Sequence, residues 1–105
     1  MSDLDDAFPS RFLKADDVLA HGDYWELTMT DVNKERIGKD LERKPIVSFR
    51  ETDKELVLNK TNGYAIAGLI GSENFADWIG KKIRLHAPTV EYKGESAPGI
   101  RVLTQ

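Results

Sequence analysis

The sequence predicts a mainly β fold, in which five strands form a Greek-key barrel with one short helix between the third and fourth strands. The first observation behind this prediction is the order of the segments, because three strand-like runs precede a single amphipathic helical run and two more follow it. The second is the length, since 105 residues suffice for one hydrophobic core but leave no room for a second large domain. We therefore expect one domain over residues 8–105, preceded by an acidic flexible leader over residues 1–7.

Three strands are predicted before the helix, from runs of β-branched and aromatic residues bounded by turn formers. The first covers Tyr24–Val32, where apolar and polar side chains alternate. The second covers Lys44–Glu51, with Pro45 at its start, where a missing N–H is tolerated. Lys34–Arg43 is rich in basic residues and lacks an apolar period, so it is predicted to be the loop between these strands. Glu55–Leu58 forms a short third strand.

The helix is predicted between the N-cap candidates of Asn59–Asn62 and a stop at Gly71. Apolar residues at helical spacing predict one buried stripe: Ala65, Ile66, Leu69 and Ile70. A second short helical turn is expected within Ser72–Gly80, with three large side chains directed inward: Phe75, Trp78 and Ile79. Gly63 and Gly68 are expected to permit close packing or capping.

Two strands are predicted after the helical segments. The fourth covers Lys81–Tyr92 and bends at Ala87-Pro88, since proline cannot donate to a central ladder. The fifth covers Ile100–Leu103, after a turn at Lys93–Ser96. Five strands with a helix at this position make the predicted barrel OB-like, and barrels of this class bind oligonucleotides and oligosaccharides.

Charge is unevenly distributed along the chain, whose net charge is −3. Met1–Asn33 holds eight acidic and two basic residues, whereas Lys34–Gln105 holds ten acidic and thirteen basic residues. The predicted barrel is thus mildly basic behind an acidic leader, which is either solubilising or an interaction tail. Because the sequence has no cysteine, no bilayer-spanning apolar run and no signal peptide, we expect a cytoplasmic protein without a membrane partner.

Catalytic and metal-binding patterns are missing from the sequence. His21 and His86 are far apart and in no metal-ligand spacing, and there is no GxSxG, GxGxxG or phosphate-binding glycine loop. We therefore expect a binding protein rather than an enzyme, with no metal and no cofactor.

Basic and aromatic side chains interleave on the predicted strands and loops, a combination suited to single-stranded nucleic acid. Cations neutralise the phosphates, and flat rings stack with the bases. The candidates on the strands are Tyr24, Trp25, Phe49, Arg50, Arg84 and Arg101. The candidates in the first loop and near the last hairpin are Lys34, Arg36, Lys39, Arg43, Tyr92 and Lys93.

Several candidates have a structural alternative. Tyr24 and Trp25 are strand neighbours, so only one of them can be exposed. Phe49 shares its face with Val47, which favours the core, and a solvated surface is the alternative for the loop cations. If no exposed ring shares a face with the basic loop, the better interpretation is a non-catalytic protein-interaction or structural barrel module.

Three segments resemble those of small, uncharacterised phage and prophage proteins, which are similar in predicted fold to phage single-stranded-DNA-binding proteins: Leu58–Asn62, Asp77–Ile83 and Gly99–Val102. The resemblance covers most of the chain from Phe8 onward. It implies a phage or prophage origin, the cytoplasm of a bacterial host and a role in DNA replication or recombination. It carries over no catalytic signature.

The leader segment Asp3–Pro9 is similar to the acidic and aromatic tip with which bacterial single-stranded-DNA-binding proteins recruit partners. It lies at the opposite end of the chain and lacks a terminal carboxylate, so chance similarity is the favoured interpretation and recruitment of replication or recombination proteins is the alternative. The sequence as a whole predicts binding of single-stranded nucleic acid, DNA rather than RNA, with low sequence specificity.

Overall fold

The structure is a computed structural model that describes residues 11–37, 42–92 and 94–104. With 43% strand and 23% helix, it confirms the mainly β class. The predicted leader, Lys39 and Lys93 lie outside the described residues.

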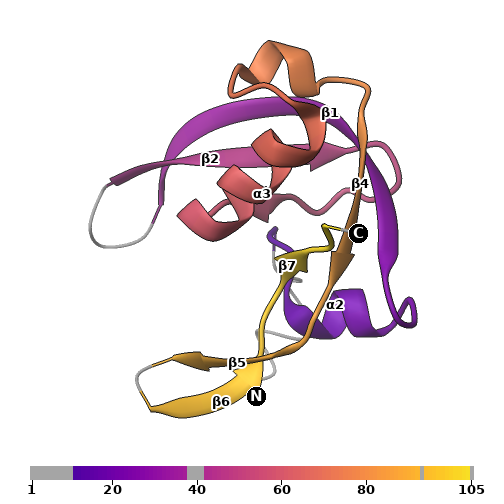
Figure 1. Cartoon of the computed structure of the whole chain (residues 1–105), viewed down its shortest axis with the longest axis vertical. Coiled ribbons are helices and arrows are strands. Elements are labelled where there is room, and N and C mark those ends of the chain that lie inside the picture. Colours follow the sequence, from indigo (N-terminus) through magenta and orange to yellow (C-terminus); the bar gives the residue numbers. More distant parts are fainter. Residues whose placement is uncertain (1–10, 38–41, 93, 105) are drawn as a thin grey trace.

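The helical elements are α2 (Ala15–Leu19), α3 (Lys60–Ile70) and the short 3-10 helix η1 (Phe75–Trp78) (Figure 1). The strands are β1 (Trp25–Ile37), β2 (Glu42–Phe49), β3 (Leu56–Val57), β4 (Lys82–His86), β5 (Thr89–Tyr92), β6 (Glu95–Pro98) and β7 (Arg101–Val102). The single strand predicted over Lys81–Tyr92 is wrong, because the chain breaks at the predicted bend: β4 ends directly before Ala87-Pro88, and β5 starts directly after it in a different sheet.

Five strands form an antiparallel sheet in the order β3-β2-β1-β4-β7, while β5 and β6 form a separate two-stranded ribbon. The long strand β1 pairs with β4 near its start and with β2 along its remainder, and its register shifts between Met29 and Asp31. Such a bulge bends the strand and lets one strand serve both neighbours. Among the described residues β3 and β7 do not pair, so the sheet is not closed and the OB-like barrel is not confirmed.

The prediction of a loop over Lys34–Arg43 is wrong at both ends. β1 continues to Ile37 and β2 begins at Glu42, with Arg36 directly opposite Arg43. The hairpin extends past the core here (Figure 1), so its exposed side chains are charged and the apolar alternation ends. Apolar periodicity reports burial of one face, and it therefore misses a strand whose two faces are both solvated.

The hydrophobic core lies between the sheet and the helical elements. Leu27 and Met29 of β1 are buried there with Ile66 of α3 and Trp78 of η1, whose inward orientation confirms the prediction. The prediction is wrong for Leu69 and Ile79, which are 45% and 43% exposed. Ile79 follows η1 with an extended backbone, so helical spacing no longer determines where its side chain points.

Two asparagines position α3 against the sheet. As predicted for the helix start, Asn59 Oδ1 accepts a hydrogen bond from Asn62 N at 2.8 Å. The buried Asn62 side chain donates from Nδ2 to Ile100 O at 3.1 Å and accepts at Oδ1 from Val102 N at 3.2 Å. At its other end, α3 stops as predicted at Gly71, which has a φ of 83°. The two bonds of Asn62 fix α3 to Ile100 and to the edge strand β7.

Candidate functional site

The predicted binding residues on β1 and β2 are divided between two faces of the sheet. Leu27 and Met29 point to the core, and after the bulge Val32 packs against the same core. Because side chains alternate along a strand, Lys34 and Arg36 follow Val32 on the core side of the hairpin. Residues at the intervening positions lie on the opposite side, which we call the outer face.

The core side of the hairpin carries three exposed cations beyond the edge of the core: Lys34, Arg36 and Arg43. We call this surface the basic face. Arg36 lies directly opposite Arg43 in the register, and like charges in directly opposed positions destabilise a sheet. None of the three forms an ion pair with another residue in the described part of the chain. The basic face is therefore a surface that an anionic ligand would stabilise.

One charge on the outer face of the same hairpin, that of Glu35, is paired within the protein. Glu35 accepts a hydrogen bond from Arg11 Nη2, and Arg11 Nε donates to Glu55 Oε1 at 2.6 Å. The bond to Glu35, with the second bond to Glu55, raises the pKa of Arg11 above its ordinary value. Glu55 in turn accepts from Ser48 Oγ at 2.8 Å. These contacts tie the segment before α2 to the sheet, a structural role.

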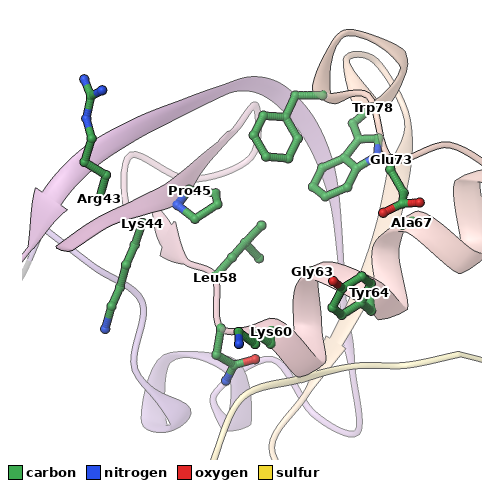
Figure 2. Close-up of a pocket in the computed structure, with 12 residues that line it drawn as sticks. Arg43, Lys44, Pro45, Leu58, Lys60, Gly63, Tyr64, Ala67, Glu73 and Trp78 are labelled. Carbon is green, nitrogen blue, oxygen red and sulfur yellow. The ribbon is translucent and has the colours of Figure 1, made fainter.

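A groove of about 560 Å³ lies between β2 and the helical elements, next to the basic face (Figure 2). We call it the helix groove. This volume is in the range of small-ligand sites in proteins, roughly 300–1,000 Å³. One wall is a single face of α3, with residues at positions i, i+3, i+4 and i+7: Lys60, Gly63, Tyr64 and Ala67. The remaining lining comes from β2, from Leu58 and Asn59 before α3, and from Glu73, Phe75 and Trp78.

Two aromatic side chains border the helix groove without being sealed in the core. Tyr64 is 69% exposed, the highest value among the exposed large hydrophobic residues described. Phe75 is half-buried, and its ring lies 4.9 Å from that of Trp78 at an angle of 60°. Trp78 is buried, and its Nε1 donates to Ser72 O at 2.9 Å. The groove thus has a firmly packed indole on one side and a freely accessible phenol ring on α3.

The charges along the helix groove are segregated. Figure 2 shows Arg43 and Lys44 at one end, leaving β2 on opposite sides, and Glu73 beside Trp78 at the other end. Lys60 stands in the first turn of α3, where the helix dipole disfavours a cation. Its position therefore adds positive charge to the groove without helping the helix.

The two aromatic candidates of strand one differ in exposure. Tyr24 is 46% exposed, and the guanidinium of Arg84 lies 5.1 Å from its ring centroid. Arg84 is also paired with Glu26, with 3.4 Å between Nε and Oε2. Trp25 is half-buried against the core and stacks on His21, with ring centroids 3.6 Å apart. Tyr24 and Arg84 therefore lie together, but on the outer face and away from the basic face.

Phe49 is the clearest correction among the candidates, because it is buried in the core and cannot stack with a base. It lies on the core side of β2 together with Val47, and its side chain is buried for that reason.

Arg50 is exposed directly after β2, where its backbone N–H donates to Thr28 O at 3.0 Å. Arg101 is half-buried, with Nη1 donating to Ile100 O at 2.9 Å. The side chain of Tyr92 lies outside the described residues, as do Lys39 and Lys93.

Sequence reasoning did not select Tyr64 or Lys60, although a signal for both exists. Their spacing with Gly63 and Ala67 marks a second face of the helix, distinct from the apolar stripe. The expectation that Gly63 and Gly68 permit close packing is wrong, because a Cβ added at either position meets no atom within 4 Å. The glycine at position 63 instead leaves the groove wall open beside Tyr64.

Comparisons of the chain with known protein families, with curated proteins and with solved structures found no match. The resemblance to phage proteins therefore stays a prediction. Within residues 11–37, 42–92 and 94–104, no three histidine or carboxylate side chains are grouped so that they could hold a metal ion. In the same residues no helix has the length and apolar character needed to cross a membrane.

Proposed function

We propose that this protein binds single-stranded nucleic acid with low sequence specificity, with DNA as the expected ligand. The observation that carries the proposal is the basic face. Its three cations have no ion-pair partner among the described residues, and one of them, Arg43, lines a groove that contains an exposed aromatic ring. Contacts from lysine and arginine to phosphates are independent of base sequence, which accounts for the low specificity.

The topology supports the proposal at the level of fold. An OB-like barrel opened between its third and fifth strands has the strand order 3-2-1-4-5, with a helix between strands three and four. The order β3-β2-β1-β4-β7 fits this description if β7 is counted as the fifth strand and β5–β6 as an inserted hairpin. Figure 1 shows the β1–β2 and β5–β6 hairpins extending to the same side of the molecule, as the two loops that flank the ligand do in barrels of this class.

The alternative is a protein-interaction or structural barrel module in which the sheet is only a scaffold. It would be favoured by a basic face without a nearby exposed ring. The ring of Tyr64 lies in the groove that adjoins the basic face, and this arrangement favours nucleic acid. A role in phage replication or recombination follows only from the sequence resemblance and is part of the proposal.

Fluorescence anisotropy of a labelled oligo-dT, measured over a series of salt concentrations, tests the proposed function. Three to five neutralised phosphates give a slope of log affinity against log salt of about −2 to −3.5, at about −0.7 per contact on single strands. A duplex of the same length and an oligo-rU serve as comparisons, and both are expected to bind more weakly. Absence of binding at low salt, or an affinity independent of salt, contradicts the proposal.

A further inference from the structure

We propose that the helix groove is a subsite for one nucleobase, which stacks on Tyr64 of α3 while the adjoining phosphates contact the basic face. This inference rests on the proposed function and deepens it. It assigns the aromatic contact to α3, on the opposite side of the sheet from Tyr24 and Arg84.

The first argument is that the ring of Tyr64 is exposed while its helix is held in place. A stacking platform must expose a flat face while its other contacts hold it in place. Tyr64 lies on a helix whose end is fixed to β7 by the Asn62 hydrogen bonds, yet its side chain is 69% exposed. An exposed tyrosine on a rigid element loses little conformational freedom on binding, since it has only two side-chain torsions.

The second argument is space. Gly63 and Ala67 stand on the same face of α3 as Tyr64, and they are the two smallest residue types. An added Cβ at Gly63 meets no atom within 4 Å, so the space beside the tyrosine is not filled by the fold. A glycine in a helix interior lowers stability relative to alanine, and at Gly63 no close packing contact offsets this loss.

The third argument is the direction of the charges. Arg43 and Lys60 provide positive charge at the β2 side and at the start of α3, whereas Glu73 is at the end beside Trp78. A phosphate is attracted by the first two and repelled by the carboxylate. The base therefore points toward Phe75 and Trp78, and the sugar-phosphate chain runs along the basic face.

Two variants test the subsite from opposite directions. Tyr64→Ala removes the platform, and Gly63→Leu fills the groove with a side chain that improves helix propensity. Each is expected to weaken binding of an oligo-dT by about 5- to 150-fold, the effect of losing one stacked base. The full chain is used throughout, and circular dichroism with a thermal scan verifies that each variant is folded.

Matched controls exist for both variants. Tyr24→Ala removes an exposed tyrosine from the outer face, and Thr61→Leu adds the same side chain at an exposed position of α3 outside the helix groove. Both are expected to bind as the wild type does. An abasic strand of equal length keeps the phosphates but has no base to stack, so its affinity is expected to be the same for wild type and Tyr64→Ala.

The outcomes separate the subsite from the function on which it rests. If wild type binds oligo-dT and folded Tyr64→Ala and Gly63→Leu bind equally well, the subsite is overturned and the proposed function stands. An equal loss of affinity for the abasic strand in Tyr64→Ala also overturns it, because the tyrosine then does not read a base. If wild type binds no single strand, both proposals fail.

Discussion

Two surfaces of this protein combine an exposed tyrosine with nearby arginine, and they differ in what their charges contact. On the outer face, Arg84 lies over Tyr24 and is paired with Glu26, and Arg11 is paired with Glu35 and Glu55. On the core side, the basic face and Tyr64 have no such partners in the described part of the chain.

The difference shows why residue type alone is a poor guide to a binding surface. Arg11 and Arg84 already have carboxylate partners, and a ligand phosphate would have to displace them. The basic face meets the groove at Arg43 and places Arg36 and Arg43 opposite each other, so an anion there relieves repulsion instead of breaking a pair. The following predictions test this contrast through measurements of stability and of binding.

The largest effect is expected from the aromatic residue beneath the helix groove. Trp78→Ala should lower the free energy of unfolding by about 3–5 kcal/mol, the usual cost of truncating a buried large aromatic side chain. Tyr24→Ala is the control on the outer face and should change stability by less than about 0.5 kcal/mol, as exposed positions do. Urea unfolding followed by circular dichroism measures both. Equal losses would mean that the two aromatic residues are not divided into core and surface as described.

The second prediction concerns Glu51, an exposed carboxylate with a structural role. It accepts hydrogen bonds from Thr28 N and Thr28 Oγ1, both at 2.7 Å, and Thr28 itself is buried. Glu51→Ala leaves these two donors without their acceptor and should cost about 1–3 kcal/mol in unfolding free energy.

The same contact gives a dependence on pH. The hydrogen bond from the Thr28 backbone, with that from its hydroxyl, lowers the pKa of Glu51 below its ordinary value of 4.5. A lowered pKa in the folded state stabilises the protein above the unfolded value, and this contribution is lost as pH falls through the folded value. The difference in stability between wild type and Glu51→Ala should therefore shrink on acidification below pH 4.5. A difference that stays constant would argue against the contact.

Much of the fold was accessible from sequence because its signals are local. The caps at Asn59 and Gly71, the bend at Ala87-Pro88 and the burial of Trp78 all follow from residues a few positions apart. The extent of the β1–β2 hairpin was not accessible. Lys34–Arg36 and Arg43 place charges on both faces of its described end, so nothing in its periodicity distinguishes a solvated strand from a loop.

Sequence predicts only part of the candidate site, because residue charge is visible in the sequence and long-range contacts are not. Lys34, Arg36 and Arg43 were selected by their charge, and the cross-strand register brings them together. Sequence reasoning does not identify Tyr64, because its place beside the groove depends on how α3 is fixed to β7. That attachment is the Asn62–Val102 contact, between residues about 40 positions apart. A sequence pattern indicates which helix face is apolar, but it does not indicate which other face borders a groove.

The third prediction compares the cations of the two surfaces in binding. The double variant Arg36→Ala/Arg43→Ala should reduce the steepness of log affinity against log salt by about 1.4, at about 0.7 for each lost phosphate contact. Lys82→Ala/Arg84→Ala removes two exposed cations from the outer side of β4 and should leave the slope unchanged. A change of similar size in both variants would indicate diffuse attraction over the whole protein and would remove the distinction between the surfaces.

The smallest effect is expected from the cross-strand pair in the absence of ligand. Arg36→Thr removes one of two like charges that face each other and introduces a residue with high strand propensity, so the free protein should gain about 0.2–1 kcal/mol in unfolding free energy. The gain should fall as salt is added, because screening weakens the repulsion in wild type. Glu35→Thr, one residue earlier and on the outer face, loses the contact with Arg11 and should not be stabilised. A loss of stability in Arg36→Thr would mean that the arginine serves the fold, and the basic face would then carry no sign of selection for a ligand.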